Sequence, residues 1–330
     1  MLNKSYAWIL LVAVSGVSAG VQAQPAATGA AAAYPSRPIR LLSGFAPGGA
    51  TDIAARVVAQ KLTQSLGQPM VVENRPGAAG NIAAEMVARG APDGHLMYLA
   101  NATIATPSLF TRVPFEVTRD FAFVSMIGLG PSGLVVHPSL PVRSMKELIA
   151  LAKSRPGQLN YASSAVGGAL HLAAELLNIM VGTKMQHIPY KGSSQLMPDL
   201  IAGQIHLSFQ SMIGSIPFIN SKRVKALGIT STTRSPALPN VPTFAEGGLP
   251  KYELAAWYGI LLPAGTSKEI TARLSAEMAK ILALPGVRKE LATQGLEPFT
   301  SSPEQFTAMI KADLDKFARI IKTANIRYEQ

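Results

Sequence analysis

The stretch Ile39-Arg-Leu-Leu-Ser-Gly-Phe-Ala-Pro-Gly-Gly-Ala-Thr-Asp52 combines the signals that decide the fold of this protein. Its first five residues are a short apolar run typical of a buried strand. A glycine-rich turn follows over 44–49, and residues 51–66 then repeat apolar side chains at helical spacing up to Gly67, a residue type that commonly ends a helix. A strand, a glycine-rich turn and a helix in this order are typical of an α/β protein.

The same alternation continues along the chain. Further apolar runs predict strands at 70–73, 96–100, 159–162, near 185–188, 205–209 and 224–229, and at 256–262. Helices are predicted at 81–89, from Ser144 to about Lys153, at 169–181, and in three final segments that start with Thr266-Ser-Lys-Glu269, Pro285 and Ser302-Pro-Glu-Gln305. This pattern indicates two α/β units with a mainly parallel sheet, and it allows the final helices to complete the first unit around an inserted second one.

The composition narrows the classes of function. Only 15% of the 330 residues are charged and 48% are hydrophobic, which argues against a disordered chain. The absence of cysteine excludes a disulfide scaffold, a thiol nucleophile and a cysteine-ligated metal site. The net charge of +11 suggests nucleic-acid binding, but the densest basic cluster is only Lys222, Arg223 and Lys225, and 6% of the chain is aromatic. We therefore expect no nucleic-acid partner, and a basic surface that attracts small anions.

Residues 1–23 have the three parts of a secretory signal peptide. Lys4 supplies the positive charge, residues 8–14 supply the apolar segment, and Val21-Gln-Ala23 is a small-x-small cleavage site. The apolar segment is short for a membrane-spanning helix. We therefore expect export to the periplasm with cleavage after Ala23, and a small-residue tail over 24–33 that is disordered.

Two strand-to-helix loops carry the strongest signal for a binding site. The first is Gly44-Phe-Ala-Pro-Gly-Gly-Ala-Thr-Asp52 and the second is Ala162-Ser-Ser-Ala-Val-Gly-Gly168. Free backbone N–H groups and the helix dipole favour an anion at a helix N-terminus, and paired glycines allow its close approach. The first loop matches neither GxGxxG nor a Walker loop, and it is also compatible with an ordinary tight turn. Two such loops together suggest the opposing halves of one anion site.

A hydrolytic site is an alternative use of the second loop. Ser163 or Ser164 would be the nucleophile, and His171 lies about one turn into the following helix. The GxSxG elbow is absent, so we do not expect an enzyme. The five histidines form no HxxxH or HExxH pair, and we expect neither a metal nor a cofactor. Lys191 either presents a cation to an acidic ligand or is an ordinary solvated charge.

These loops belong to a longer series of motifs that follow one another over nearly the whole chain after residue 33. The series contains Tyr34-Pro-Ser-Arg-Pro-Ile, the first loop, Val71-Val-Glu-Asn-Arg-Pro-Gly-Ala-Ala-Gly-Asn81, Asn160-Tyr-Ala-Ser-Ser164, Pro189-Tyr-Lys-Gly192, Asp199-Leu-Ile-Ala-Gly-Gln204 and Trp257-Tyr-Gly-Ile-Leu-Leu-Pro-Ala-Gly265. In these motifs the chain resembles the Bug family, the TctC-like periplasmic solute-binding receptors of tripartite tricarboxylate transporters.

The resemblance implies a type II-like periplasmic binding protein with two α/β domains, crossing strands between them and a ligand cleft. By this analogy the first domain comprises 34–130 and 256–330, and the second comprises 131–255. The crossings are expected near 127–132 and 254–258. The implied function is capture of a small organic carboxylate and its delivery to the membrane subunits of the transporter, by a receptor that we expect to be a monomer. A co-receptor for a membrane sensor kinase is an alternative that the sequence does not separate from transport.

The resemblance also implies that the two loops hold a ligand carboxylate largely through backbone amides, with Asn81 and Asn101 facing the cleft. Many family members carry an acidic residue where this chain has Gln210, which predicts a ligand without an amine. The predicted ligand-binding residues are Phe45, Ala46, Pro47, Gly48, Gly49, Thr51, Asp52, Asn81, Asn101, Ser163, Ser164, Gly167, Gly168, His171, Lys191 and Gln210.

Overall fold

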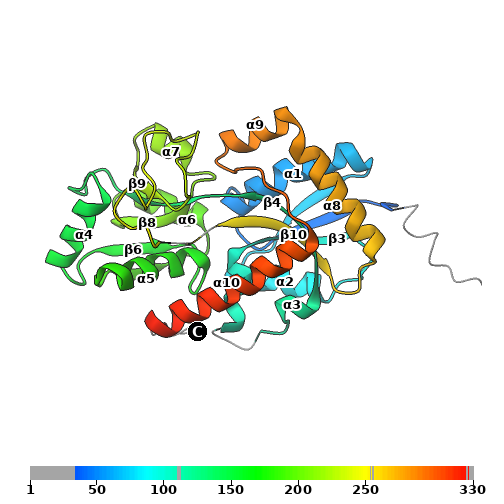
Figure 1. Ribbon diagram of the computed structural model, residues 1–330, viewed down its shortest axis with the longest axis horizontal. Coiled ribbons are helices and arrows are strands. Elements are labelled where there is room, and N and C mark those ends of the chain that lie inside the picture. The colour runs from blue at the N-terminus through cyan, green and yellow to red at the C-terminus, as the bar shows by residue number, and fades with distance from the viewer. Residues whose placement is uncertain (1–33, 110–112, 253, 255, 325, 327–330) are drawn as a thin grey trace, which may run out of the picture. The chain divides into compact units, whose positions relative to one another are not determined.

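The computed structural model describes residues 34–109, 113–252, 254, 256–324 and 326, and Figure 1 shows their arrangement. The predicted signal peptide, its cleavage site after Ala23 and the tail over 24–33 lie outside the described residues. From Tyr34 onward the chain forms two five-stranded sheets with helices between the strands. The prediction of an α/β fold is therefore confirmed.

The first sheet has the strand order β2-β1-β3-β10-β4. The bounds of these strands, in the same order, are Met70–Asn74, Ile39–Ser43, Leu96–Asn101, Trp257–Pro263 and Phe121–Leu129. β1 is parallel to β2 and β3, whereas β10 is antiparallel to both β3 and β4. Strands from the beginning and from the last third of the chain therefore share one sheet.

The second sheet has the strand order β7-β6-β8-β5-β9. The bounds of these strands, in the same order, are Gln186–Pro189, Asn160–Ser163, Leu207–Ser211, Ser132–Val136 and Lys225–Ile229. β6 is parallel to β7 and β8, whereas β5 is antiparallel to β8 and β9. Only Gly130 and Pro131 separate β4 of the first sheet from β5 of the second, so the chain passes directly from one sheet to the other.

The prediction of a mainly parallel sheet is wrong in one respect, because both sheets are mixed. β10 in the first sheet and β5 in the second are antiparallel to both of their neighbours. Each of these strands follows a segment that comes from the other sheet, so its direction is set by the crossing and not by a strand–helix–strand connection. The local sequence patterns also did not predict β4 and β5 as strands.

The helices connect the strands. Those that match predicted segments are α1 Ala50–Leu66, α2 Asn81–Ala88, α4 Met145–Ser154, α5 Ala169–Val181, α8 Lys268–Ala283, α9 Pro285–Thr293 and α10 Pro303–Ala324. Those that we did not predict are α3 Val117–Asp120, α6 Ser193–Ile201, α7 Ile216–Asn220 and the 3-10 turns η1 Ala78–Gly80, η2 Ala102–Ala105 and η3 Pro107–Leu109. No helix within the described ranges is both long and apolar enough to cross a membrane.

The predicted helix starts are present, with one correction. Ser302 and Gln305 exchange hydrogen bonds as a reciprocal capping box at the start of α10. At α8, however, Ser267 accepts the Ile270 N–H and is the N-cap, not Thr266. The Thr266 hydroxyl donates instead to the Pro263 carbonyl at the end of β10, so this residue still belongs to the turn before the helix.

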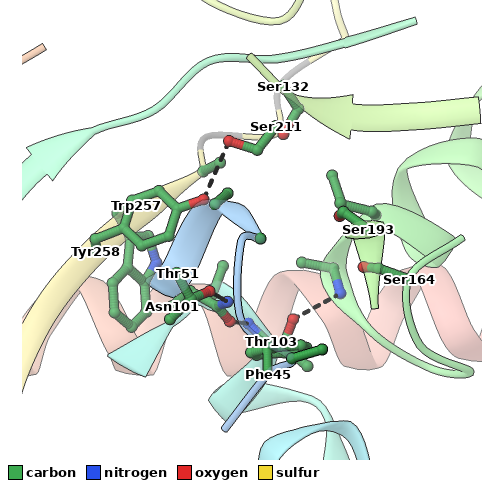
Figure 2. A pocket seen from close by; sticks show the side chains of 17 residues that line it. Phe45, Thr51, Asn101, Thr103, Ser132, Ser164, Ser193, Ser211, Trp257 and Tyr258 are labelled. Atoms are coloured by element: carbon green, nitrogen blue, oxygen red, sulfur yellow. Dashed lines mark hydrogen bonds between the residues drawn. The ribbon is translucent and has the colours of Figure 1, made fainter. Parts of the chain in front are cut away.

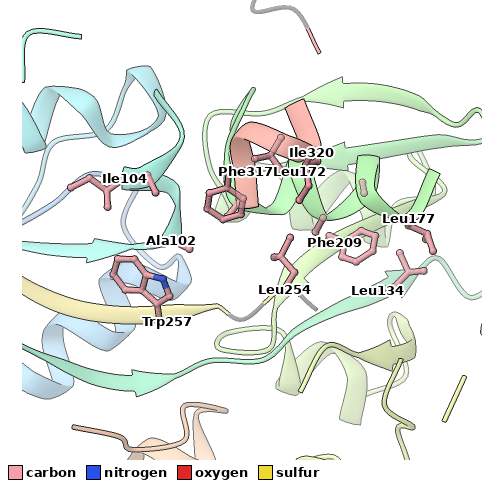
Figure 3. Close-up of a cluster of buried hydrophobic side chains, with 14 of the residues drawn as sticks. Ala102, Ile104, Leu134, Leu172, Leu177, Phe209, Leu254, Trp257, Phe317 and Ile320 are labelled. Carbon is pink, nitrogen blue, oxygen red and sulfur yellow. The ribbon is translucent and has the colours of Figure 1, made fainter. Parts of the chain in front are cut away.

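One hydrophobic core extends over both sheets. Figure 3 shows part of it, with Trp257 and Ala102 next to the first sheet and Leu134, Phe209 and Leu177 next to the second. α10 contributes Phe317 and Ile320 to this core and packs against both β4 and α5. Smaller cores lie between the first sheet and α1 and α8, and beside α6 and α7 in the second sheet.

Trp257 anchors α10 to the first sheet. Its indole Nε1 donates to the buried Asp313 carboxylate at 2.7 Å, and its ring packs edge-on against Phe306 with the centroids 5.1 Å apart. Gly259 leaves room for this contact, because a Cβ at that position would lie 2.3 Å from Phe306 Cζ. The C-terminal helix is therefore held against the strand that leads out of the second sheet and into the first.

Candidate functional site

A cavity of about 50 Å³ lies where strand ends from both sheets meet the first turns of α1 and α5, as Figure 2 shows. Its wall contains hydroxyl groups, one amide, apolar side chains and backbone, but no charged side chain. The lining residues are Phe45, Ala46, Gly49, Ala50, Thr51, Asn101, Ala102, Thr103, Ser132, Ser164, Ala169, Leu170, Ser193, Ser211, Ala256, Trp257 and Tyr258. Any charge on a ligand must therefore be stabilised by dipoles.

Loop 1, which we define as Ala46–Asp52, ends in a helix start without a side-chain cap. Gly48 has a φ of +75°, a conformation that favours glycine, and Gly49 is the N-cap residue with extended backbone. The first N–H groups of a helix have no acceptor inside that helix. Ala50 and Thr51 line the cavity, so their N–H groups are available to a bound anion.

The Asp52 carboxylate holds loop 1 in place without lining the cavity. It accepts hydrogen bonds from the Gly48 N–H at 3.0 Å, Asn74 Nδ2 at 3.0 Å and Arg56 Nε at 2.9 Å. Burial alone would raise the pKa of this carboxyl, but the hydrogen bonds from Arg56, Gly48 and Asn74 outweigh burial and hold the pKa below its usual value. Asp52 is therefore an ionised positioning residue.

Loop 2, which we define as Ala165–His171, follows β6 of the second sheet and includes the first residues of α5. Its backbone arrangement resembles that of loop 1. Gly167 has a φ of +68°, Gly168 is the N-cap residue of α5, and this helix start also has no side-chain cap. The Gly167 N–H is accepted by His171 Nδ1 at 2.9 Å, four residues further on, just as Gly48 is held by Asp52. Ala169 and Leu170 line the cavity.

The His171 ring is part of a buried stack of side chains behind loop 2. Its centroid lies 3.8 Å from that of His187, with 12° between the ring planes, and Tyr161 continues the stack. Burial, together with the neighbouring His187, lowers the pKa of His171 to about 3, and burial lowers the pKa of His187 to about 4. Both imidazoles are therefore neutral at pH 7, as His171 Nδ1 must be to accept a hydrogen bond.

A chain of hydrogen bonds joins the two loops through η2. Asn101 Nδ2 donates to Thr51 Oγ1 at 3.1 Å, and its Oδ1 accepts the Thr103 N–H at 3.0 Å. Thr103 Oγ1 in turn accepts the Ala169 N–H of α5 at 3.3 Å. The starts of the two helices are therefore coupled through Asn101 and Thr103, whose side chains Figure 2 shows at the cavity wall.

Two helix N-termini at one cavity create a site for an anion. Each N-terminus carries a partial positive charge of about half an elementary charge, and it stabilises a nearby anion by about 0.3–2 kcal/mol. A carboxylate offers two oxygens, each of which accepts more than one hydrogen bond. The geometry therefore fits a carboxylate between α1 and α5 without a lysine or arginine in the cavity wall.

The structure separates the predicted site residues into three groups. Phe45, Ala46, Gly49, Thr51, Asn101 and Ser164 line the cavity. A second group is not part of its lining: Pro47, Asp52, Gly167, Gly168 and His171 belong to the loops, Ser163 donates to Ala165 of loop 2, and Asn81 is the first residue of α2. A third group lines neighbouring cavities, as described next.

Two larger cavities adjoin the first. One of about 290 Å³ contains Gly48 and Gln210 in its lining and shares Gly49, Ala50 and Ser193 with the first cavity. Gln210 is buried, and its Nε2 donates to Ser208 Oγ at 2.7 Å. The other, of about 530 Å³, contains Lys191 in its lining and shares Phe45, Ala46 and Ser164 with the first cavity.

The geometry of loop 2 does not favour the hydrolase alternative. Ser163 is fully buried, its hydroxyl donates to the Ala165 carbonyl, and its Oγ lies 2.7 Å from His187 Nε2. His171 Nδ1 already accepts the Gly167 N–H. Ser164 does line the cavity, but the only hydrogen bond that the described part of the chain assigns to the His171 ring is the one to Gly167.

Sequence analysis missed several lining residues, namely Thr103, Ser132, Ser193, Ser211, Trp257 and Tyr258. Most of these residues lie at or just beyond one end of a strand. Polar residues from different chain segments come together there, at one edge of a sheet. Ser211 lies two residues beyond the predicted strand 205–209, and a polar residue at the end of a strand indicates a candidate lining position. Ser132 and Tyr258 reach the cavity on crossing strands, whose pairing no local pattern indicates.

The fold and the cavity together define the class of two-domain periplasmic binding proteins. The chain belongs to the TctC family: residues 54–326 match the family described as the tripartite tricarboxylate transporter family receptor. The resemblance seen in the sequence is thereby confirmed.

Relatives and solved structures agree with this assignment. A protein encoded in the tcbD–tcbE intergenic region of Pseudomonas sp. strain P51 is 38% identical over 291 residues, which cover 88% of this chain and 87% of that protein. BugT of Bordetella pertussis is 36% identical and covers 95% of this chain and 94% of its own. An R. palustris protein solved with adipate is 34% identical, covers 89% of this chain and 99% of its own, and has a TM-score of 0.86. MatC of Rhodopseudomonas palustris, solved with bound malate, is 27% identical, covers 87% of this chain and 100% of its own, and has a TM-score of 0.81.

Proposed function

We propose that this protein binds a small organic carboxylate between loops 1 and 2 and delivers it to the membrane subunits of a tripartite tricarboxylate transporter. The observation that carries the proposal is a pair of helix N-termini at one uncharged cavity, neither of which is capped by the side chain of its own N-cap residue. Family membership supports it, as do the adipate and malate in two similar proteins. The protein acts as a receptor and not as an enzyme.

The proposed ligand-binding residues act in two ways. The N–H groups at the starts of α1 and α5 donate to the carboxylate, and Thr51, Asn101 and Ser164 add side-chain contacts from the cavity wall. Asp52 and His171 keep the glycines of the loops in the conformation that exposes those N–H groups. Water exclusion on binding strengthens these contacts, because they then act in a medium of lower dielectric constant.

The ligand is enclosed by two domains that move relative to each other. The first consists of 34–130 and 256–330, and the second of 131–255. The passage from β4 to β5 and the segment before β10 are where the chain changes sheets, and such short connections are suited to hinge closure. The protein is exported to the periplasm after cleavage behind Ala23 and works there as a monomer.

A thermal unfolding screen of the purified protein tests this function. The protein is first unfolded and refolded to remove any ligand carried through purification. It is then heated with dicarboxylates, tricarboxylates, hydroxy acids, aromatic acids and amino acids. A ligand present at 100 times its Kd stabilises the folded state by about 2.7 kcal/mol, which raises the Tm by a few degrees.

A proline variant tests the part played by the backbone. Proline is tolerated as the first residue of a helix, so Ala50→Pro removes one N–H from the proposed site while preserving α1. We expect a Kd about tenfold or more weaker for the acid found in the screen, as for loss of a hydrogen bond to a charged group. Lys268→Pro, at the same position of α8, is the matched control and leaves the Kd unchanged. Ala50→Ser keeps the N–H and controls for added bulk.

The results separate a receptor from other functions. No rise in Tm with any acid on refolded protein would contradict the proposed function. A rise that Ala50→Pro leaves unchanged would place the carboxylate away from the start of α1.

A further inference from the structure

Ser132 has a buried hydroxyl without a partner. Two buried side-chain oxygens in the described part of the chain lack a hydrogen bond, Oγ of Ser43 and Oγ of Ser132. Both residues are 0% exposed. Buried polar groups in folded proteins nearly always have a partner, so each exception calls for an explanation. Ser132 lines the cavity, whereas Ser43 is not part of its lining.

The position of Ser132 is fixed by the second sheet. It is the first residue of β5 and pairs directly with Ser211 of β8 across the antiparallel ladder. Its backbone N–H donates to Thr230 Oγ1 at 3.2 Å, and its carbonyl accepts the Thr230 N–H at 2.8 Å. The backbone is therefore satisfied, and the hydroxyl alone is left for a partner in the cavity.

Ser211 and Tyr258 extend this polar group. The Tyr258 hydroxyl, from β10 of the first sheet, donates to Ser211 Oγ at 3.1 Å. Ser211 Oγ is thereby occupied as an acceptor, and its own proton remains for another acceptor. Figure 2 shows Ser132 and Ser211 together at one end of the cavity, with Phe45 and Thr103 at the other.

We propose that Ser132 and Ser211 donate hydrogen bonds to an oxygen at the far end of the ligand, and that this pair selects carboxylic acids with a hydroxyl, carbonyl or second carboxylate group at that end. This inference rests on the proposed function and adds to it the chemistry of the group opposite the bound carboxylate. Ser132 is thus a specificity-determining residue that our sequence analysis did not identify.

The chemistry of the cavity excludes two other end groups. An ammonium group accepts no hydrogen bond from Ser132 or Ser211, and the lining contains no carboxylate to pair with its positive charge. A second carboxylate, in contrast, accepts hydrogen bonds from both hydroxyls, which stabilise its negative charge. An alkyl end would leave the hydroxyls of Ser132 and Ser211 without an acceptor after water is excluded. An oxygen satisfies both hydroxyls.

Matched acids with different end groups test the proposal on the full-length exported protein. The four-carbon probes are butanoate, 4-hydroxybutanoate, succinate and 4-aminobutanoate, and the six-carbon probes are hexanoate, 6-hydroxyhexanoate, adipate and 6-aminohexanoate. Binding is measured by calorimetric titration after refolding. We expect an oxygen-ended acid to bind about tenfold or more tightly than the alkyl-ended and amine-ended acids of the same length.

Ser132→Ala is the decisive variant. It removes an atom that makes no hydrogen bond in the described structure, so the Tm without ligand should remain within about a degree of wild type. We expect the preference for oxygen-ended acids to fall to about threefold or less, because the variant loses one hydrogen bond to the end oxygen and no longer leaves that hydroxyl unpaired beside an alkyl end. Ser43→Ala is the matched control, because it removes the other unpartnered hydroxyl, and it should keep the full preference.

Ser211→Ala provides a second test. This variant also removes the acceptor of the Tyr258 hydroxyl, so it should lower the Tm as well as the preference for oxygen-ended acids. A preference unchanged in both Ser132→Ala and Ser211→Ala overturns the inference but leaves the carboxylate receptor standing. If the wild-type protein binds acids with all end groups equally well, the inference is also overturned and the carboxylate receptor stands. The same conclusion follows if the protein binds only acids from the wider screen and none of the matched probes. If no acid of any kind binds, the proposed function and this inference are both overturned.

Discussion

Loops 1 and 2 have the same backbone arrangement, but different side chains hold them in place. Both place a glycine with positive φ, an N-cap glycine and an uncapped helix start at the same cavity. The glycine N–H is accepted by a side chain four residues later in both loops, by the Asp52 carboxylate in loop 1 and by the neutral His171 imidazole in loop 2. The two loops therefore have in common a hydrogen-bond acceptor four residues after the glycine, but they do not have the same charge.

The difference in charge has a consequence for anion binding. The Asp52 carboxylate puts a negative charge close to the proposed carboxylate site, and the ion pair to Arg56 compensates for it. His171 is neutral and needs no such counter-charge. Loop 1 is therefore the more polar and more strongly connected support, whereas loop 2 depends on burial of the histidine stack.

Removing the acceptor of loop 1 should have the largest effect. Asp52→Ala leaves the Gly48 N–H, Asn74 Nδ2 and Arg56 without their shared partner, and we expect a loss of about 3 kcal/mol in the free energy of unfolding. Urea unfolding measures this loss. Glu85→Ala removes a carboxylate from an exposed pair with Arg89 and should change the free energy by less than about 0.5 kcal/mol. An equally small loss for Asp52→Ala would show that loop 1 does not depend on this side chain.

Removing the acceptor of loop 2 should have a smaller effect. His171→Ala deletes one hydrogen bond and one stacked ring, for an expected loss of about 2 kcal/mol in the free energy of unfolding. His171→Asn restores an acceptor oxygen and should recover part of this loss. His137→Ala, at the more exposed turn after β5, is the control and should have little effect. A larger loss in the free energy of unfolding for His171→Ala than for Asp52→Ala would show that His171, and not Asp52, contributes more to stability.

Mild acid should weaken loop 2 selectively. The pKa values of His171 and His187 are lowered to about 3 and about 4, whereas an unfolded histidine titrates near 6.5. Below pH 6.5 the unfolded state therefore binds more protons, and the stability that neutral histidines confer is lost as the pH falls. We expect a loss of about 1 kcal/mol per histidine between pH 7.0 and 5.5. Asp52 does not contribute in this window, because its pKa is held below the usual value.

The control for this prediction is the His171→Ala variant. It should lose about half of the pH dependence, measured as the change in urea midpoint between pH 7.0 and 5.5. Stability that stays constant or rises as the pH falls from 6.5 would contradict the neutral histidine stack.

The smallest effect is expected for Arg56, whose positive charge pairs with Asp52 of loop 1. Arg56 is 57% exposed at its side chain, so its pair with Asp52 contributes at most about 1 kcal/mol to stability. Arg56→Gln should therefore change the urea midpoint little, but it should weaken carboxylate binding a few-fold at low salt and less at high salt. Arg89→Gln, in the exposed pair with Glu85, should not change the Kd. An Arg56→Gln protein with wild-type affinity at low salt would show that the charge of Asp52 is not felt in the cavity.

The parts of the fold that depend on local sequence were predictable. Loop 1 and loop 2 each lie between a strand and a helix of one continuous segment, and the glycine pairs mark the turns where positive φ is needed. Four of the six predicted residues that line the cavity, Phe45, Ala46, Gly49 and Thr51, are neighbours in the sequence as well as in space.

The features that depend on pairing between distant segments were not predictable. β4 and β5 are apolar like other strands, but their antiparallel partners in β10 and β8 lie far away in the sequence. Ser132 becomes a lining residue only through its pairing with Ser211. The partnership of His187 with His171 likewise arises because β7 lies beside β6 in the sheet.

The proposed binding mode places one carboxylate between the starts of α1 and α5. Nuclear magnetic resonance of isotope-labelled protein, titrated with the tightest-binding acid of the thermal screen, tests it directly. If the carboxylate lies there, the backbone amide signals of Ala50, Thr51 and Leu170 shift together and reach saturation at the same acid concentration. Shifts confined to one loop, or centred on the cavity around Lys191, would show that the acid binds elsewhere.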